Sequence, residues 1–316
     1  MSALECMLKS AAKHTVLSDP GSMASYFDAV DPRENFQEVI DSVGSIYAQF
    51  QRDVMNKGHT IDDSKQHEVD LRYAEAILKH SHSLQPITWR KGTPLSKRVM
   101  GVCRDNCLVL VSWLRHYNIP ARVRYGFIRH CFNACYPYID HTIVDYWDEK
   151  EQCWKYAEPM LTTEYKQEYS LDLCAWDLPR SEYIGACDAW NMARQDNSKL
   201  RQFSGFKFDD LWASIVVRNS VMRDLAASVE YESLLWDCWG YMLKLTYTEE
   251  ETAQHHALID QVASLDLQDP EQWLKAIALY QQTPVLQVKN VSSVSPYRGR
   301  HPITENVKNL AEESTC

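Results

Sequence analysis

Several features that would assign this chain to a class of protein are absent from it. The first residues, MSALECMLKSAAKH, contain no long apolar run before a small-residue cleavage site, so we expect no signal peptide. No stretch approaches the roughly 18 consecutive apolar residues of a membrane-spanning helix. There is no dense block of lysine and arginine, and the formal net charge is −10, which disfavours binding to nucleic-acid phosphates. We therefore expect a cytoplasmic protein that binds neither nucleic acid nor membrane.

Cysteine is too sparse for a disulfide-stapled miniprotein, with ten in 316 residues. The cysteines lie in apolar segments, which fits a reducing compartment. A zinc site is one alternative, because two cysteine pairs accompany nearby histidines: Cys103 and Cys107, Cys131 and Cys135, His130 and His141. Neither pair has the two-residue spacing that is typical of structural zinc sites. We therefore expect no metal and no cofactor.

The chain also lacks internal repeats and Gly/Ser-rich linkers, so we expect one unit rather than an array of domains. Its 45% hydrophobic and 11% aromatic content is enough for a large buried core. Apolar spacing predicts helices over residues 35–55, 68–79 and 103–117, with a loop at 85–98. Alternating or β-branched segments predict strands at 122–128, 141–147 and 153–157.

Helical patterns return in the last third of the chain. We expect helices over residues 181–194, 209–225, 228–245 and 248–263, and a final helix that Asp269 caps, with Pro270 in its first position. This order predicts an α+β fold in which an antiparallel sheet packs on the helix that begins at Cys103. We divide the chain into a helical lead-in (1–98), a central core (99–170), a helical part of the same unit (171–288) and a mobile tail (289–316).

The strongest chemical signal is the run Gly101-Val102-Cys103-Arg104-Asp105-Asn106. A thiol reacts as its thiolate, and the unpaired N–H groups at a helix start favour negative charge and can hold an oxyanion. A glycine before the cysteine permits a tight turn and the close approach of a substrate. Cys103 is therefore placed as a nucleophile for acyl transfer, with a buried structural cysteine as the alternative.

A histidine and a carboxylate follow at the edges of the predicted strands. His141 lies in Asp140-His141-Thr142-Ile143-Val144-Asp145, at the expected start of a strand, and Glu158 follows the next strand. A thiol nucleophile needs a base, and that base needs a third group that fixes its orientation. Cysteine, histidine and carboxylate in this order predict a catalytic triad.

The core of the chain resembles the transglutaminase-like superfamily. The resemblance is carried by GVCRDNCLVLVSWLRHYNIPARVRYGF, by DHTIVDYWD and by WKYAEPML. It extends over about residues 15–245, where Ser18-Asp19-Pro20-Gly21, Ala189-Trp190 and Trp236-Asp237-Cys238-Trp239-Gly240 are similar to a bacterial branch. That branch includes transglutaminase homologues of polyketide and nonribosomal-peptide antibiotic pathways. The resemblance implies a papain-like core for residues 99–170, with Cys103 as nucleophile, His141 as base and acid, and Glu158 as the orienting acid.

The sequence departs from the family pattern at two positions. Asn118 stands where the family has glycine before Ile-Pro-Ala-Arg, and asparagine tolerates the left-handed conformation that ends a helix. Glu158 stands where the family has aspartate. Its side chain is one methylene longer, so the strand that carries it must lie slightly further from His141. Asp145 is the alternative orienting group, because it lies four residues from His141 along a strand and points to the same side.

Four charged residues near the motif receive a structural interpretation. Arg104 and Asp105 are expected to form a local ion pair at the helix start. Arg122 and Arg124 are expected to be structural, with the binding of a phosphate or carboxylate as the alternative.

By resemblance, the protein is expected to be an acyltransferase that joins an acyl group on one carrier protein to an aminoacyl group on another. Its partners would be acyl or peptidyl carrier proteins and an amine acceptor. Two alternatives stay open. The acyl group could pass to water, as in a cysteine peptidase, amidase or deamidase, or the chain could be a non-catalytic binding module with a degenerate triad.

Overall fold

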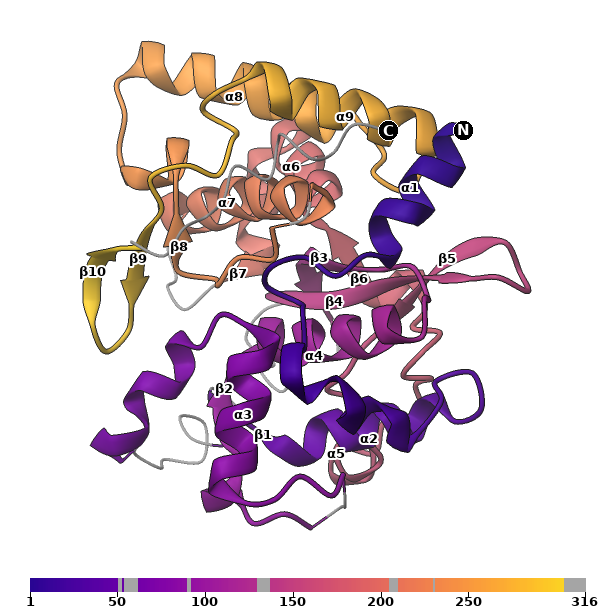
Figure 1. The fold of residues 1–316 in the computed structure, drawn as a ribbon. Helices are drawn as coiled ribbons and strands as arrows, with labels where there is room; N and C mark the ends of the chain where they lie inside the picture. Colours follow the sequence, from indigo (N-terminus) through magenta and orange to yellow (C-terminus); the bar gives the residue numbers. More distant parts are fainter. Residues whose placement is uncertain are drawn as a thin grey trace. The chain divides into compact units, whose positions relative to one another are not determined.

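The computed structural model describes residues 1–50, 53, 62–89, 92–129, 137–204, 210–229 and 231–303. The fold is α+β, as the sequence predicts, with the longer strands in the centre of the chain (Figure 1). The largest sheet has the strand order β5-β4-β3-β6, and β7 pairs with β4. Its strands are β3 (Ala121–Ile128), β4 (Tyr138–Asp148), β5 (Cys153–Ala157), β6 (Tyr183–Gly185) and β7 (Phe203–Ser204).

The chain divides into two compact units rather than the single unit that the lack of linkers suggests. Unit 1 comprises Met1–Ser10, Arg124–Thr142 and Arg180–Cys316, and unit 2 comprises Ala11–Val123 and Ile143–Pro179. The units are therefore interleaved along the sequence, and both β3 and β4 carry residues of each. The division does not follow the consecutive segments drawn from the sequence pattern.

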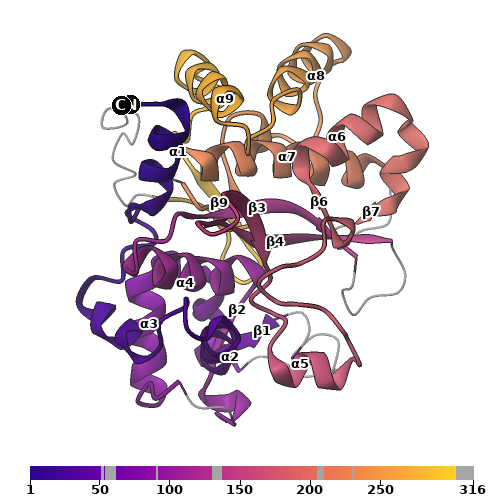
Figure 2. The ribbon, with the colours of Figure 1, turned by 90° about the vertical axis from the view of Figure 1, so that its right-hand side faces the viewer.

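Unit 2 is built around a buried helix, α4. Its helices are α2 (Phe36–Ile46), α3 (Ala74–Leu84), α4 (Cys103–His116) and α5 (Thr163–Glu168). Helices α2 and α3 both pack on α4 (Figure 2). Strands β1 (Tyr47–Gln49) and β2 (Val99–Gly101) pair in parallel, and β2 leads directly into α4. Within the same unit, β5 pairs antiparallel with the second half of β4, from Val144↔Ala157 to Asp148↔Cys153.

Helix α4 forms where the sequence predicts it, because every residue from Cys103 to Arg115 is buried and the apolar ones supply its core contacts. It ends at His116, and Asn118, just after the C-cap Tyr117, has a φ of 55°. The N–H of Asn118 donates to the carbonyl of Arg115 (2.9 Å) and that of Ile119 to the carbonyl of Leu114 (2.9 Å), the pattern of a left-handed helix terminus. The prediction that asparagine can replace glycine here is confirmed.

Unit 1 holds the C-terminal helices. These are α6 (Ala186–Gln195), α7 (Asp210–Ser228), α8 (Glu249–Ala263) and α9 (Pro270–Gln282), and α1 (Ala3–Ala12) begins in the same unit. Helix α7 packs against α6, α8 and α9 (Figures 1 and 2). The predicted cap of α9 is confirmed, because the Asp269 carboxylate accepts a hydrogen bond from the N–H of Gln272 at 2.9 Å. A small antiparallel sheet joins β8 (Asp237–Cys238), β9 (Ser292–Ser295) and β10 (Gly299–Pro302).

Five of the predicted segments differ from the structure. The helix expected over 35–55 ends at Ile46, because the next residues pair with β2 as β1. The helix expected over 68–79 begins only at Ala74, because residues Asp63–Asp70 form a 3₁₀ helix. Within that 3₁₀ helix, the Glu68 carboxylate accepts a hydrogen bond from the N–H of Met100 (2.7 Å).

Further along, the segment 181–194 becomes helical only at Ala186, after β6 has paired with β3. No helix continues over 228–245 in the described residues; β8 and a short 3₁₀ helix at Gly240–Leu243 lie there instead. In the segment predicted to be a mobile tail, 289–316, strands β9 and β10 pair with each other, and residues 304–316 lie outside the described residues.

Candidate functional site

Cys103 is the first residue of α4 and belongs to unit 2. Its thiol is free of any disulfide, and the residue is 4% exposed. Val102 before it is extended, with φ −117° and ψ 177°, so the chain enters the helix directly from β2. This is the placement that the sequence predicts for a nucleophile at a helix start.

The turn that carries Cys103 is held by Asp105. Its carboxylate accepts a hydrogen bond from the N–H of Val102 at 2.8 Å, and Arg104 Nη1 lies 3.1 Å from the other oxygen. Burial raises the pKa of Asp105, and the neighbouring Arg104 charge opposes that rise. The predicted Arg104–Asp105 ion pair is confirmed, and it fixes the first turn of the helix.

Gly101 allows the backbone before the nucleophile to pack closely. A Cβ atom at this position would lie 2.9 Å from Asp105 Oδ2 and 2.9 Å from Tyr47 Cε1. The Tyr47 hydroxyl in turn donates to the backbone carbonyl of Asp105 at 3.1 Å. A larger residue than glycine would push these groups apart, so the tight turn expected at Gly101 has a packing cause.

Glu158 directly follows β5 and also belongs to unit 2. It is fully buried, and its Oε1 accepts a hydrogen bond from the N–H of Met160 at 2.8 Å. Its own N–H donates to the carbonyl of Ala175 at 2.7 Å. A buried carboxylate held in this way keeps one orientation, which is what the third member of a triad requires.

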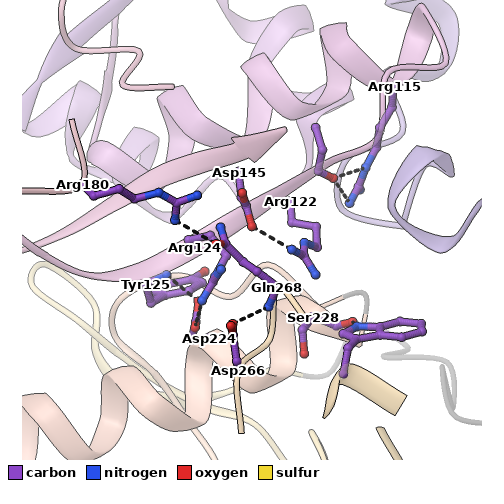
Figure 3. A network of polar contacts seen from close by, with 12 residues as sticks. Arg115, Arg122, Arg124, Tyr125, Asp145, Arg180, Asp224, Ser228, Asp266 and Gln268 are labelled. Atoms are coloured by element: carbon purple, nitrogen blue, oxygen red, sulfur yellow. Dashed lines mark hydrogen bonds and ion pairs between the residues drawn. The ribbon is translucent and has the colours of Figure 1, made fainter. Parts of the chain in front are cut away.

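Asp145, the alternative orienting group, is bound by an arginine within unit 2. Arg122 Nη2 donates to Asp145 Oδ2 at 2.7 Å, and both side chains are almost fully buried (Figure 3). The Arg122 guanidinium lies 3.9 Å from the ring centroid of Trp154. Glu158 and Asp145 are thus both buried and hydrogen-bonded, and the choice between them stays a prediction.

His141 belongs to unit 1. Strand β4 begins three residues earlier than predicted, at Tyr138, so His141 lies inside the strand rather than at its start. It is 5% exposed. The neighbouring Asp140 is half-buried, and burial raises its pKa to about 6, opposed by the charges of His141 and Arg223. The structure therefore places Cys103 and Glu158 in one unit and His141 in the other.

Arg124 also has a carboxylate partner. Its Nε and Nη2 donate to the two oxygens of Asp224 at 2.9 and 2.8 Å, and the N–H of Tyr125 donates to the same carboxylate (Figure 3). Asp224 is fully buried. The structural interpretation of Arg122 and Arg124 is confirmed, because each is paired with a buried carboxylate in its own unit.

A pocket of about 290 Å³ lies in unit 2 beside the first turn of α4. Asn106, one helical turn after Cys103, lines it, and so do Pro159 and Met160, which follow Glu158. Among the lining residues that the structure describes, four carry a carboxylate and one a guanidinium: Asp41, Asp53, Glu164, Glu168 and Arg98. Asn106 is 4% exposed, and its Oδ1 has no hydrogen-bond partner.

The sequence gives no local signal for this pocket. Its lining comes from four separate segments, and a single asparagine inside a helix looks like any other polar residue. The signal that was available is the spacing of Asn106 from Cys103, since residues three apart on a helix are neighbours.

The zinc alternative concerns residues that lie partly outside the described ones, namely His130, Cys131 and Cys135. Among the residues that are described, no group of three or more histidine, cysteine, aspartate or glutamate side chains could hold a metal ion.

Comparisons of the chain with family models, with curated proteins and with solved structures found no match. None of the helices in the described part of the chain combines the length and the apolar character that a membrane crossing requires. The chemistry of the site must therefore be argued from its own residues.

Proposed function

We propose that the protein is a cysteine-nucleophile acyltransferase of the transglutaminase-like type. The observation that supports this most directly is the free thiol of Cys103 at the first position of the 14-residue helix α4. The first N–H groups of a helix have no partner within it, so they can donate to the oxyanion of a tetrahedral intermediate. A thiol at this point can attack a carbonyl that those groups hold.

The proposed reaction starts with the proton of the Cys103 thiol on His141, and the Cys103 thiolate attacks the carbonyl carbon of an acyl thioester to form a C–S bond. The tetrahedral intermediate collapses and expels the donor thiolate, which takes a proton from His141. An amine then attacks the acyl-enzyme, His141 accepts the proton of the attacking amine, and the C–S bond to Cys103 breaks. The products are an amide and a free thiol, and the enzyme regains its starting protonation state.

Glu158 is proposed as the group that orients His141, with Asp145 as the alternative. Glu158 is supported by its position after β5 and by its fixed carboxylate. Asp145 is supported by its position four residues from His141 in β4, although its carboxylate is already paired with the Arg122 guanidinium.

The acyl donor is proposed to be a thioester on an acyl or peptidyl carrier protein, and the protein is proposed to act in the cytoplasm in antibiotic biosynthesis. This part rests on the family resemblance at the level of fold. The seven cysteines found as free thiols, Cys6, Cys103, Cys107, Cys153, Cys174, Cys187 and Cys238, fit a reducing compartment.

The acidic pocket supports an amine as acceptor. Four carboxylates and one guanidinium stand among its described lining residues, and the field of these residues favours a cationic or hydrogen-bond-donating group. The unpartnered Oδ1 of Asn106 is an acceptor that an amine N–H can satisfy. We place the acceptor amine in this pocket, one helical turn from Cys103.

Mass spectrometry after incubation with a labelled acyl-carrier thioester tests the nucleophile. We expect an acyl adduct on Cys103 in the wild type and none in Cys103→Ala. Cys107→Ala is the matched control, because Cys107 lies one turn further along α4 and is fully buried. An adduct that persists in Cys103→Ala, or no adduct in any form, would contradict the proposal. Added amine should give an amide; release of the free acid alone would favour hydrolysis.

The acceptor pocket has a separate test. Asn106→Ala should raise the KM for the amine about tenfold, the value of one hydrogen bond to a charged group, while the rate of Cys103 acylation stays unchanged. A merely structural role of Asn106 would change both. Glu164→Gln removes one exposed carboxylate of the same pocket and should raise the KM less.

A further inference from the structure

Arg98 gives the pocket beside α4 a guanidinium with unused hydrogen-bond donors. Its side chain is 14% exposed, and its Nε donates to the carbonyl of Thr93 at 2.8 Å. Neither Nη1 nor Nη2 makes a hydrogen bond to any residue that the structure describes. Glu164 Oε2 lies 3.9 Å from Nη2, beyond hydrogen-bond length, on a side chain that is 77% exposed. An exposed ion pair of this length is weak, so it leaves the outer edge of the guanidinium open.

The main chain around Arg98 is held on both sides. Its N–H donates to the carbonyl of Leu95 at 3.1 Å, and its own carbonyl accepts a hydrogen bond from Lys65 Nζ at 2.8 Å. Strand β2 begins at the next residue and leads into Cys103. A guanidinium that is fixed through its Nε and its backbone loses little freedom when it binds a ligand. Arg98 is therefore arranged in advance to receive an anion near the nucleophile.

The same pocket offers an open acceptor at Asn106. Its Oδ1 is buried and has no hydrogen-bond partner. The buried carboxylates of the lining are already engaged: Asp41 accepts hydrogen bonds from the N–H and the Oγ1 of Thr163 at 2.6 and 2.7 Å, and Asp53 accepts one from the N–H of Gln49 at 2.8 Å. These two carboxylates supply negative charge, and Asn106 supplies the free acceptor. Together they favour an ammonium group.

We propose that this pocket binds a free amino acid as its zwitterion. The ammonium group donates to Asn106 Oδ1, and the carboxylate accepts hydrogen bonds from Nη1 and Nη2 of Arg98. One guanidinium matches one carboxylate through two parallel N–H···O bonds. A phosphate would bring more negative charge than one guanidinium compensates, beside four carboxylates. A volume of about 290 Å³ suits a molecule of this small size.

This inference names the class of the acceptor for the proposed acyl transfer. Its use as an acceptor rests on the proposed function, whereas its binding does not. An aminoacyl thioester on a carrier protein has no free carboxylate and leaves the Arg98 fork unused. The structure therefore favours an acceptor that enters the pocket as a free amino acid.

Binding of amino acids and of their carboxamides to the full chain isolates the carboxylate. The probes are glycine, β-alanine and 4-aminobutanoate, each titrated at pH 7 against its own amide and followed by ligand-observed NMR. The amide keeps the ammonium group and the size but carries no negative charge. We expect at least one amino acid to bind about 10- to 100-fold more tightly than its amide, the range for hydrogen bonds to a charged group.

Four variants assign this preference to residues. Arg98→Gln should lose most of it, and Asn106→Ala should weaken the amino acid and the amide by similar factors. Glu164→Gln should increase the preference, because it removes the carboxylate that competes for Nη2. Lys97→Gln is the matched control: it removes an exposed positive charge from the neighbouring residue, which is not among the described lining residues, and should keep the preference.

Equal binding of acid and amide in all three pairs by the wild type, or an undiminished preference in Arg98→Gln, would overturn the proposal. Circular dichroism establishes that each variant is folded. Arg98→Lys provides a further variant if Arg98→Gln unfolds: it keeps the charge without the fork and should retain only part of the preference. A full preference in Arg98→Lys would contradict binding by the fork.

No acyl donor takes part in these titrations, so their outcome is independent of catalysis at Cys103. If Cys103 is never acylated but binding of an amino acid depends on Arg98, the acyltransferase proposal fails and the amino-acid site stands. If Cys103 is acylated and amines accept the acyl group, but no amino acid binds more tightly than its amide, the acyltransferase proposal stands and the amino-acid site fails.

Discussion

At the scale of single residues, Gly101 leaves room for Asp105 and Tyr47 to pack against the backbone just before Cys103. Replacing it with alanine puts a methyl group 2.9 Å from both Asp105 Oδ2 and Tyr47 Cε1, neither of which is the end of a long flexible chain. We expect Gly101→Ala to destabilise the protein by about 1–3 kcal/mol, the usual cost of overpacking. The midpoint of urea unfolding measures this.

The control for that experiment is Gly185→Ala. A Cβ at Gly185 meets its nearest atom, Asp188 Oδ2, at 3.7 Å, which is ordinary contact, and its φ of −61° suits any residue. Equal effects of the two substitutions would show that the loss comes from glycine chemistry in general and not from crowding at Cys103.

A second prediction at this scale concerns pH. Burial raises the pKa of Asp140 from its ordinary 3.8 to about 6, so the folded protein holds this proton more tightly than the unfolded chain. The stability that this proton provides is full below pH 3.8 and is lost as the pH rises towards 6. Asp140→Asn should therefore unfold at a higher temperature than the wild type at pH 7, and at a similar temperature at pH 4. A difference in unfolding temperature between the two proteins that is larger at pH 4 than at pH 7 would contradict this.

At the scale of elements, helix α4 ends through a left-handed residue. Asn118 has a φ of 55°, a conformation that costs an alanine roughly 1–2 kcal/mol and a glycine almost nothing. We expect Asn118→Ala to lower the free energy of unfolding by about 1 kcal/mol and Asn118→Gly to leave it unchanged or raise it. An alanine variant as stable as the wild type would mean that the terminus rearranges.

The elements that the sequence predicts are those with local signals. Helix α4 has a long apolar face and a marked end at Asn118, and α9 has an acidic cap followed by proline. Strands β1, β2 and β8 are two or three residues long and form only because a distant segment pairs with them. Periodicity cannot detect so short an element, so the apolar spacing over 35–55 predicts a helix that includes residues 47–49.

The same distinction applies to the candidate sites. Cys103 is predictable because glycine, cysteine and a helix start are neighbours in sequence. The burial of Arg218 and Arg223 in α7 is not predictable, because a helix sequence shows that an arginine is present but not how exposed its side chain is. The acidic pocket beside Asn106 is equally hidden, since its walls come from distant segments.

At the scale of the whole molecule, neither unit is a continuous piece of chain. A fragment that ends at Pro179 keeps the segments of unit 2 but only Met1–Ser10 and Arg124–Thr142 of unit 1. It lacks β6, which pairs with β3 on the side away from β4, and it lacks Asp224, the partner of Arg124. Leaving a buried charge without its partner costs about 3–5 kcal/mol, a large share of the roughly 5–15 kcal/mol that stabilises a domain.

We therefore expect fragment 1–179 to show no cooperative thermal transition in near-ultraviolet circular dichroism, although it contains Cys103, His141 and Glu158. A fragment that ends at Ile303 is the control: it retains every helix and strand that the structure describes, and it should unfold as the full chain does. A cooperative transition of fragment 1–179 at the temperature of the full chain would show that unit 2 folds alone. Because both β3 and β4 pass through the two units, we expect instead that their folding is coupled through the covalent chain.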